Sequence, residues 1–219
     1  MQNIEHLKKQ ISIAVNLFKA KRFDELILKG IILIKKFPDQ PIFYNVTALA
    51  YNAVGKCNKA KKLLNEVLKK EPNNISVLNN MGLTSVDCGE DVEAEEYYNR
   101  ALEIDSAFID VLINLGNLKT KQNKSEEAKE FFIKAIKINN KITPPKLALA
   151  GYYEQSGNFE EAKNLYKEIL KNEPNFTIAD KSLSLIHKYK DGDNHLKVME
   201  EKLTKNIGEE GAERLNFAI

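Results

Sequence analysis

The apolar positions along this chain follow the spacing of helices. In the stretch 75–108 they form two series, with members three and four residues apart, on either side of a turn at Cys88-Gly89-Glu90. The first series is Leu78, Met81 and Gly82, and the second is Ala94, Tyr97, Tyr98, Ala101 and Leu102. Such steps place side chains on one face of a helix. Alternation with a period of two, typical of a half-buried strand, is not sustained anywhere, so the pattern predicts two amphipathic helices here and an all-α fold.

This pair of helices recurs with a period of 34 residues. Pro38 and Pro72 are 34 residues apart, and Pro174 follows 102 residues later, which is three times 34. The same step relates the alanines Ala60, Ala94, Ala128 and Ala162, the turn residues Gly55, Gly89, Asn123 and Gly157, and the small residues Ala14, Ala48, Gly82, Gly116, Ala150 and Ser184. The prolines missing from the series are replaced by Ser106 and Asn140, which suit a helix end or turn. A period shared by four kinds of position predicts a repeat protein.

The recurring residue types have a physical reason. A Gly or Ala where two helices cross lets their backbones approach closely, and Tyr98, Phe132 and Tyr166 are suited to fill the larger spaces between units. Asn is the non-glycine residue that most readily accepts a left-handed backbone, so Asn123 is predicted to adopt one at its turn. Proline at the end of a unit stops the second helix.

This pattern closely resembles the tetratricopeptide repeat family. The resemblance rests on these residues: Tyr51, Gly55, Ala60 and Pro72 in 41–74; Met81, Gly82, Gly89, Ala94, Tyr98 and Ala101 in 75–108; Leu115, Gly116, Ala128, Phe132 and Ala135 in 109–142; and Tyr153, Gly157, Ala162, Tyr166 and Pro174 in 143–176. It implies an all-α, right-handed superhelix (a solenoid) of about six antiparallel helix pairs, followed by a truncated final helix. The chain departs from the family where its Trp is replaced by Tyr44, Leu78, Leu112 and Lys146. It also departs at the first-helix aromatic position, where Ser85 and Lys119 lead us to expect looser packing.

The flanks of the repeat array are weaker. Residues 1–40 form a degenerate helix pair, in which Gly30 within the second helix should cost about 1 kcal/mol relative to alanine. Four units follow at 41–74, 75–108, 109–142 and 143–176. In 177–219 we expect a helix to about Lys190, a break at 191–194 and a second helix from about 195 to 205. A further helix from 209 to 219 has no polar outer face, which suggests a truncated chain.

Composition excludes several classes of protein. The net charge is +2 and 43% of the 219 residues are hydrophobic, which does not fit a disordered chain or a dedicated nucleic-acid binder. No apolar stretch approaches the roughly 20 residues of a membrane span, and no secretory signal precedes the first helix. Two cysteines, Cys57 and Cys88, are too few for a disulfide scaffold and fit a reducing compartment. We therefore predict a cytoplasmic protein that binds neither nucleic acid nor membrane.

Catalytic constellations are absent from the sequence. It contains no GxxxxGK[ST], GxGxxG or GxSxG motif, its three histidines are scattered, and its cysteines lack the CxxC spacing of zinc ligands. His187 is predicted to lie on the core-facing side of its helix and to have a packing role. Acidic clusters such as Glu126-Glu127 belong to first turns of second helices and Lys69-Lys70 to a last turn, where each sign complements the helix dipole. We therefore expect no enzyme activity, metal or cofactor, and the oligomeric state is left open.

A binding surface follows from the family resemblance. First-helix positions that do not pack in the core are expected to line a groove for a protein or peptide ligand. The polar residues among them are Asn45, Asn52, Asn79, Asn80, Asn114, Asn117, Lys121 and Glu154. An amide offers both donors and acceptors, so a row of asparagines can bind a peptide backbone without reading its side chains. This resembles the asparagine ladder in the repeat arm of protein O-linked sugar transferases.

Two alternatives to the ladder remain open. Asparagine is common throughout this chain, and its abundance with Lys and Ile beside only three arginines is typical of an AT-rich genome. A second binding mode, the clamp for a terminal carboxylate, needs a lysine where this chain has Asn45, Asn79 and Ile113, and is therefore disfavoured.

The segment from about Leu183 to Ile219 resembles the junction of bacterial proteins in which tetratricopeptide repeats precede a sulfotransferase domain. The resemblance implies an alternative function, in which the chain is the substrate-recruiting arm of a larger transferase. The catalytic domain itself, with its phosphate-binding loop, is missing from this sequence.

Overall fold

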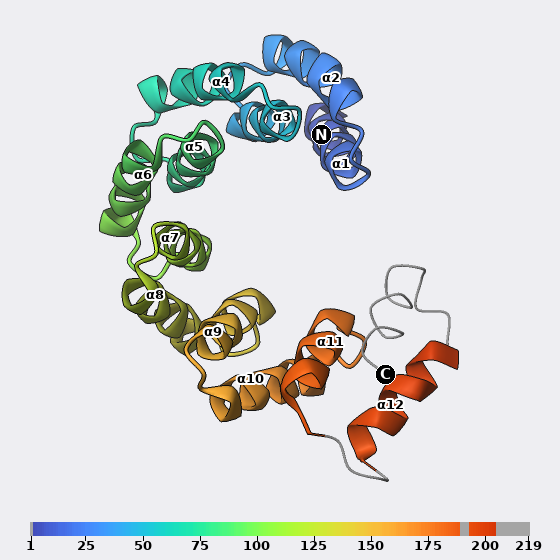
Figure 1. Cartoon of the computed structure of the whole chain (residues 1–219). Coiled ribbons are helices and arrows are strands. Elements are labelled where there is room, and N and C mark those ends of the chain that lie inside the picture. Colours follow the sequence, from blue (N-terminus) through green and yellow to red (C-terminus); the bar gives the residue numbers. More distant parts are fainter. Residues whose placement is uncertain (1, 189–192, 205–219) are drawn as a thin grey trace. The chain divides into compact units, whose positions relative to one another are not determined.

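The structure, a computed structural model, describes residues 2–188 and 193–204 (Figure 1). These residues form twelve α-helices and contain no strand. The helices are α1 (Gln2–Lys19), α2 (Phe23–Lys36), α3 (Pro41–Ala53), α4 (Cys57–Lys70), α5 (Ile75–Asp87), α6 (Asp91–Ile104), α7 (Ile109–Lys121), α8 (Ser125–Ile138), α9 (Thr143–Gln155), α10 (Phe159–Asn172), α11 (Thr177–Ile186) and α12 (Asn194–Thr204). The predicted all-α repeat fold is confirmed.

The chain forms two compact units, Met1–Leu118 and Lys119–Ile219. In the first unit the odd-numbered helices form one layer and the even-numbered helices the other (Figure 1). Each helix there packs mainly on its sequence neighbours, as in the pairs α3 with α4 and α5 with α6. In the second unit α9 packs on both α8 and α10, and α10 packs on α11. Each helix thus buries one face against its neighbours in the array.

Five turns between paired helices have the same hydrogen bonding. In each, one residue has a positive φ, and these residues are spaced by 34: Lys21, Gly55, Gly89, Asn123 and Gly157. At Gly55 the backbone N–H bonds to the Asn52 carbonyl, and the next N–H, of Lys56, bonds to the Tyr51 carbonyl, both at 2.8 Å. This pair of bonds is the Schellman motif, which needs a left-handed residue. The predicted conformation of Asn123 is confirmed at φ 59°.

Where the repeat lacks its proline, a side chain stabilises the turn instead. The Asp105 carboxylate accepts a hydrogen bond from the backbone N–H of Ala107 at 2.9 Å. One repeat later, the Asn139 side-chain oxygen accepts one from the N–H of Lys141 at 3.0 Å. In such an Asx turn the side chain bonds to the backbone two residues later, and this stabilises the end of the second helix without the fixed φ that proline would provide. Ser106 and Asn140 therefore lie in turns, as predicted.

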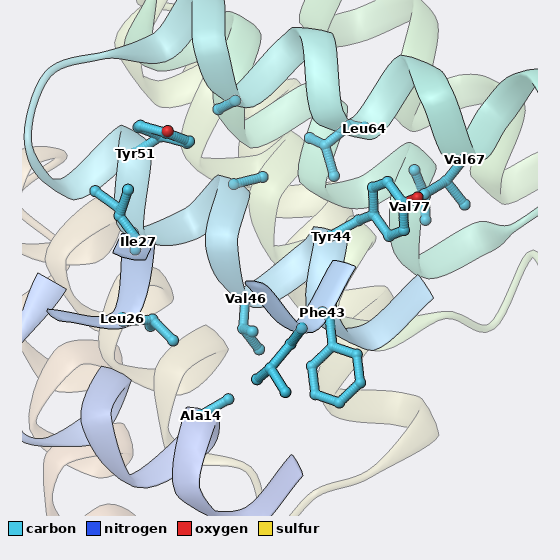
Figure 2. Packing of buried hydrophobic residues seen from close by; sticks show 14 of the residues in the cluster. Ala14, Leu26, Ile27, Phe43, Tyr44, Val46, Tyr51, Leu64, Val67 and Val77 are labelled. Carbon is cyan, nitrogen blue, oxygen red and sulfur yellow. The ribbon is translucent and has the colours of Figure 1, made fainter. Parts of the chain in front are cut away.

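The core of the first unit begins with the helices of the N-terminal pair. Ala14 of α1, Leu26 of α2 and Phe43 of α3 are buried together, and the same cluster continues to Leu64 of α4 and Val77 of α5 (Figure 2). The N-terminal helix pair is therefore packed against the repeats that follow it.

Two glycines lie where a neighbouring element approaches the helix backbone. A Cβ at Gly30 of α2 would lie 2.0 Å from the Thr47 hydroxyl oxygen of α3, and a Cβ at Gly82 of α5 would lie 2.3 Å from Cε1 of Tyr98. Glycine at position 30 therefore permits a close contact with Thr47 that alanine would block, and this offsets the expected helix-propensity cost of Gly30. Tyr98 packs on Gly82 of its own unit, and burial raises the pKa of its phenol.

Polar residues replace aromatic ones in the core without leaving unpaired groups. Ser85 is fully buried and donates a hydrogen bond to Glu93 at 3.0 Å. One repeat later, Lys119 is 4% exposed and its Nζ lies 3.0 Å from Glu127 Oε2. Lys146, at the position of the family Trp, is buried and paired with Glu168. Both Ser85 and Lys119 are thus buried and bonded, and the looser packing expected around them stays a prediction.

The last described elements differ from the sequence prediction. Helix α11 ends at Ile186, whereas we expected it to continue to about residue 190. His187 is therefore the C-cap residue of α11 and does not lie within the helix, where the sequence predicted it. It is half-buried, and its Nε2 lies 2.8 Å from Asp193 Oδ2. Helix α12 spans Asn194–Thr204, close to the predicted bounds. The helix expected at 209–219 and residues 191–192 of the expected break lie outside the described residues.

The close contact at Gly82 predicts the effect of an alanine there. We expect Gly82→Ala to lower the free energy of unfolding by about 1–3 kcal/mol, because the new methyl group overlaps the buried Tyr98 ring. Gly151, also within a helix, has no atom within 4 Å of a built Cβ, so Gly151→Ala should raise it by about 0.5–1 kcal/mol. Urea unfolding of both variants tests this. Equal effects at the two sites would contradict it.

The turn at Lys21 predicts a stabilising substitution. A non-glycine residue in the left-handed region costs about 1–2 kcal/mol, and Lys21 has φ 55°. We expect Lys21→Gly to raise the melting temperature, and Gly55→Ala at the matched position, φ 71°, to lower it. Thermal unfolding followed by circular dichroism measures both. A lower melting temperature in Lys21→Gly would contradict the claim that the left-handed backbone of Lys21 is strained.

Candidate functional site

The first unit contains a pocket between the ends of α3 and α5. Its volume is about 510 Å³, within the range of ligand sites. The residues that line it are Leu49, Asn52, Ala53, Gly55, Cys57, Leu83 and Asp87. Leu49, Asn52 and Leu83 all lie on first helices, and Asn52 is one of the polar residues that the sequence assigns to a groove. The structure therefore brings together one of the predicted polar residues and two of its apolar neighbours.

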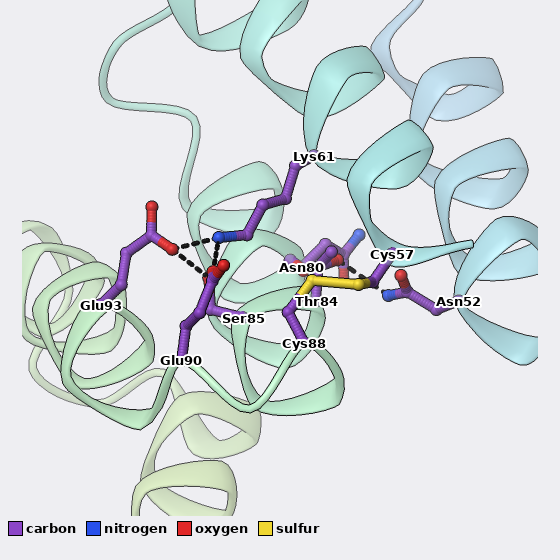
Figure 3. Close-up of polar contacts among 9 residues, drawn as sticks. All are labelled: Asn52, Cys57, Lys61, Asn80, Thr84, Ser85, Cys88, Glu90 and Glu93. Carbon is purple, nitrogen blue, oxygen red and sulfur yellow. Dashed lines mark hydrogen bonds and ion pairs between the residues drawn. A yellow bond between two sulfur atoms is a disulfide. The ribbon is translucent and has the colours of Figure 1, made fainter. Parts of the chain in front are cut away.

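Asn52 links two successive first helices. Its Nδ2 donates a hydrogen bond at 2.8 Å to Oγ1 of Thr84 in α5, and Thr84 in turn donates to the Asn80 carbonyl at 2.7 Å (Figure 3). The other amide atom, Oδ1, is buried and has no hydrogen-bond partner among the described residues. The orientation of the amide is fixed by its bond to Thr84, so Asn52 offers an unused acceptor.

A second pair of asparagines joins the next two first helices. Nδ2 of Asn114, in α7, donates to Oδ1 of Asn79, in α5, at 2.8 Å. Asn79 is only 9% exposed, whereas Asn114 is half-buried. Two of the predicted ladder residues therefore bond to each other. An amide has two donor hydrogens and two acceptor lone pairs, so this bond leaves capacity for a ligand on Asn114.

The other predicted residues differ in exposure. Asn45 is buried, with an Oδ1 that lacks a partner among the described residues. Asn80 is half-buried and Asn117 is exposed. Lys121 and Glu154 belong to the second unit, where Lys121 is exposed and Glu154 is half-buried with an unpaired, buried Oε1. Buried polar atoms are normally bonded, and the four described ones that are not are Asn45 Oδ1, Asn52 Oδ1, Gln122 Oε1 and Glu154 Oε1.

Cys57 and Cys88 form a disulfide, with their Cα atoms 5.8 Å apart (Figure 3). Cys57 is the first residue of α4 and Cys88 follows the last residue of α5, so the bond joins the turns of two successive units. The expectation of reduced cysteines is wrong. The sequence could not reveal the bond, since pairing depends on how neighbouring units stack, and Cys57 lines the pocket beside Asn52.

The same junction is held by charge. Lys61 of α4 forms ion pairs with Glu90 and Glu93 at the start of α6, and Glu93 also accepts the hydrogen bond from Ser85 (Figure 3). The side chain of Lys61 is only 15% exposed, which strengthens such a pair relative to one on the surface. The disulfide and these ion pairs both join α4 to the helix pair of α5 and α6.

Sequence reasoning missed a pocket in the second unit. It has a volume of about 370 Å³ and lies among α10, α11 and α12. Asp180 is fully buried there, with both carboxylate oxygens bonded to Lys202 Nζ at 2.7 and 2.8 Å and one also 3.1 Å from His195 Nε2. Hydrogen bonds from His187 and the His195 backbone hold the pKa of Asp193 below its ordinary value. Asp180 lies 34 residues after Lys146, and its partner Lys202 lies 34 residues after Glu168, so this pair repeats the Lys146–Glu168 ion pair with its charges reversed. The period therefore carried a signal for Asp180 and Lys202, but not for His195 or Asp193.

No group of three or more His, Cys, Asp or Glu side chains within the described residues is arranged to hold a metal ion. Residues 2–188 and 193–204 also contain no helix whose length and apolar character would let it cross a membrane.

Comparison with known proteins places the repeats in a family. The family model of the tetratricopeptide repeat matches residues 75–108, 109–142 and 146–176. These three segments are tetratricopeptide repeats. No curated protein matches this sequence.

Solved tetratricopeptide repeat structures have the same fold. TTC0263 of Thermus thermophilus is 15% identical, with a TM-score of 0.73 over 82% of this chain and 97% of that one. PilF of Pseudomonas aeruginosa is 16% identical, with a TM-score of 0.72 over 99% of each chain. Cut9, solved as a hetero-tetramer with Hcn1, is 14% identical, with a TM-score of 0.70 over 96% of this chain and 42% of the matched chain. At these identities the likeness shows the fold alone.

The disulfide predicts a large loss of stability on its removal. It closes a loop between residues 31 positions apart, and such a cross-link restricts the unfolded chain by roughly 3–4 kcal/mol. We expect the double variant Cys57→Ser/Cys88→Ser to have a free energy of unfolding that is lower by about this amount, and therefore to unfold at a lower urea concentration. The oxidised wild type treated with a thiol reductant should reach the same midpoint. A midpoint that reduction does not move would contradict the prediction.

Proposed function

We propose that this chain is a protein-interaction scaffold that binds an extended peptide on the face of α3, α5 and α7. The tetratricopeptide repeat fold suggests a role in protein interaction, and Cut9, which shares the fold, was solved with the protein Hcn1. The observation that carries the proposal is the unused acceptor of Asn52, which lines a pocket together with Leu49 and Leu83.

The chemistry of the pocket suits a peptide backbone. Oδ1 of Asn52 would accept a peptide N–H, and this would satisfy an atom that is otherwise buried without a bond. Leu49 and Leu83 offer apolar contact to one side chain of the ligand. Asn114, half-buried and bonded to Asn79, adds a second amide on the neighbouring first helix. Peptide ligands present N–H and C=O groups along their length, so successive first helices can bind them in succession.

The experiment measures peptide affinity in asparagine variants. Twelve-residue peptides selected against the chain from a random library would be titrated by fluorescence anisotropy. We expect Asn52→Ala to weaken binding roughly five-fold, because a hydrogen bond is worth about 1 kcal/mol. We expect Asn80→Ala/Asn114→Ala also to weaken it several-fold.

The control separates the proposed role from the high asparagine content of the chain. Asn65 and Asn99 are exposed asparagines on the second helices α4 and α6, and Asn65→Ala/Asn99→Ala should leave affinity unchanged. Equal losses in both sets, or no loss at Asn52, would sink the proposal. The same titration with a twelve-nucleotide RNA tests the prediction that nucleic acid is not a ligand.

A further inference from the structure

Helix α2 has an apolar stripe on its solvent side in addition to its buried face. Leu28, Ile31 and Ile32 are 68%, 37% and 64% exposed. Their spacing of three and four residues places them on one face of the helix. The buried face consists of Leu26, Ile27, Gly30 and Leu33. Helix α2 is therefore apolar on two sides, and only one of these sides is covered within the described residues.

The other repeats show that the fold does not require this stripe. The positions 34, 68 and 136 residues after Leu28, Ile31 and Ile32 lie on α4, α6 and α10. They hold Lys62, Asn65 and Glu66, then Glu96, Asn99 and Arg100, then Asn164, Lys167 and Glu168. On α8 they hold Glu130, the half-buried Ile133, and Lys134. The second helix of a unit is thus normally polar here, so the apolar residues of α2 point to a contact outside this chain.

Charged residues flank the stripe with opposite signs at its two ends. Asp24 and Glu25 lie in the first turn of α2, and Lys35 and Lys36 in the last turn, all of them exposed. Asp24 and Lys36 are each four residues beyond the stripe, so they share its face. A two-fold axis near Gly30 would place Asp24 opposite Lys36 and Glu25 opposite Lys35 of a second α2, because each pair of numbers sums to 60. The same axis places Leu28 opposite Ile32, so the face is complementary to its own antiparallel copy.

We propose that α2 is the interface of a symmetric homodimer, in which the α2 helices of two copies pack antiparallel through Leu28, Ile31 and Ile32. A two-fold axis uses the same surface of both copies, and a self-complementary pattern is what such an interface requires. Asp24 and Glu25 balance Lys35 and Lys36, so this face lacks the basic excess that binds an anionic membrane, which favours a second copy over a lipid surface. One pair of fourteen-residue helices lies at the small end of interface sizes, so the dimer should dissociate in the micromolar range.

The proposed interface is separate from the proposed peptide site. Helix α2 belongs to the even-numbered layer of the first unit, whereas the peptide site lies on α3, α5 and α7 (Figure 1). A dimer would therefore leave both peptide sites open and present two of them together. The dimer and the peptide site can each hold or fail independently of the other.

Sedimentation velocity of the full chain across a range from roughly 1 µM to 1 mM tests the dimer. We expect wild type to change from monomer to dimer in this range. The variant Leu28→Lys/Ile31→Asn/Ile32→Glu copies the α4 sequence at these positions, so it should fold, and we expect its dimer affinity to fall at least ten-fold. The matched variant Lys62→Ala/Glu66→Ala on α4 should dimerise as wild type does. A wild type that stays monomeric, or a triple variant that still dimerises, would overturn the proposal.

A charge swap tests the antiparallel arrangement. Glu25→Lys and Lys35→Glu should each weaken the homodimer, because each places like charges opposite one another twice. Mixing the two variants should restore dimerisation, since the lysine introduced in one copy then faces the glutamate introduced in the other. Far-ultraviolet circular dichroism confirms that each variant is folded before mixing. No recovery in the mixture, or strong binding of the wild type to phosphatidylserine vesicles with no dimer in solution, would refute the arrangement.

Discussion

The fold depends on the packing of a large second-helix side chain against a small first-helix residue sixteen positions earlier. Tyr98 packs on Gly82 so closely that even a methyl group there would overlap the ring. Ala48 with Leu64, and Ala150 with Tyr166, have the same spacing and are buried in common clusters. Because the spacing recurs every 34 residues, one contact sets the distance and register of each helix pair, and the Schellman turns fix the reversal between the two helices.

Within this frame, the core tolerates polar residues wherever a partner lies eight residues later. Ser85 bonds to Glu93, and one repeat on Lys119 pairs with Glu127. At the equivalent position of the preceding unit, the ammonium of Lys59 lies over the ring of Tyr51. A buried charge without a partner would cost several kcal/mol. The residue at this first-helix position and the residue eight positions later therefore differ from unit to unit as a matched pair, while the two helices keep the same contact.

Sequence periodicity predicted what each residue does within its own unit. It predicted the helix pairs, the left-handed Asn123 and the turns at Ser106 and Asn140. The left-handed backbone of Lys21 follows from the same period, because Lys21 lies 34 residues before Gly55. Lysine disfavours that conformation, so the residue type alone gave no sign of it. Contacts between units were not predictable in this way. The Cys57–Cys88 disulfide and the bond between Asn79 and Asn114 join residues whose spacing is not 34, and they depend on how successive units stack.

The candidate site reflects the same division. The period placed Asn52 on the first-helix face, but only the stacking of α3 and α5 shows that its Nδ2 is used and its Oδ1 is not. The disulfide removes the argument from reduced cysteines for a cytoplasmic location, which stays a prediction, as does the role as arm of a larger transferase. The register of the helix pair is tested most directly by nuclear Overhauser effects between the Tyr98 ring protons and the α protons of Gly82. The account predicts strong effects between them, and their absence in the folded chain would contradict it.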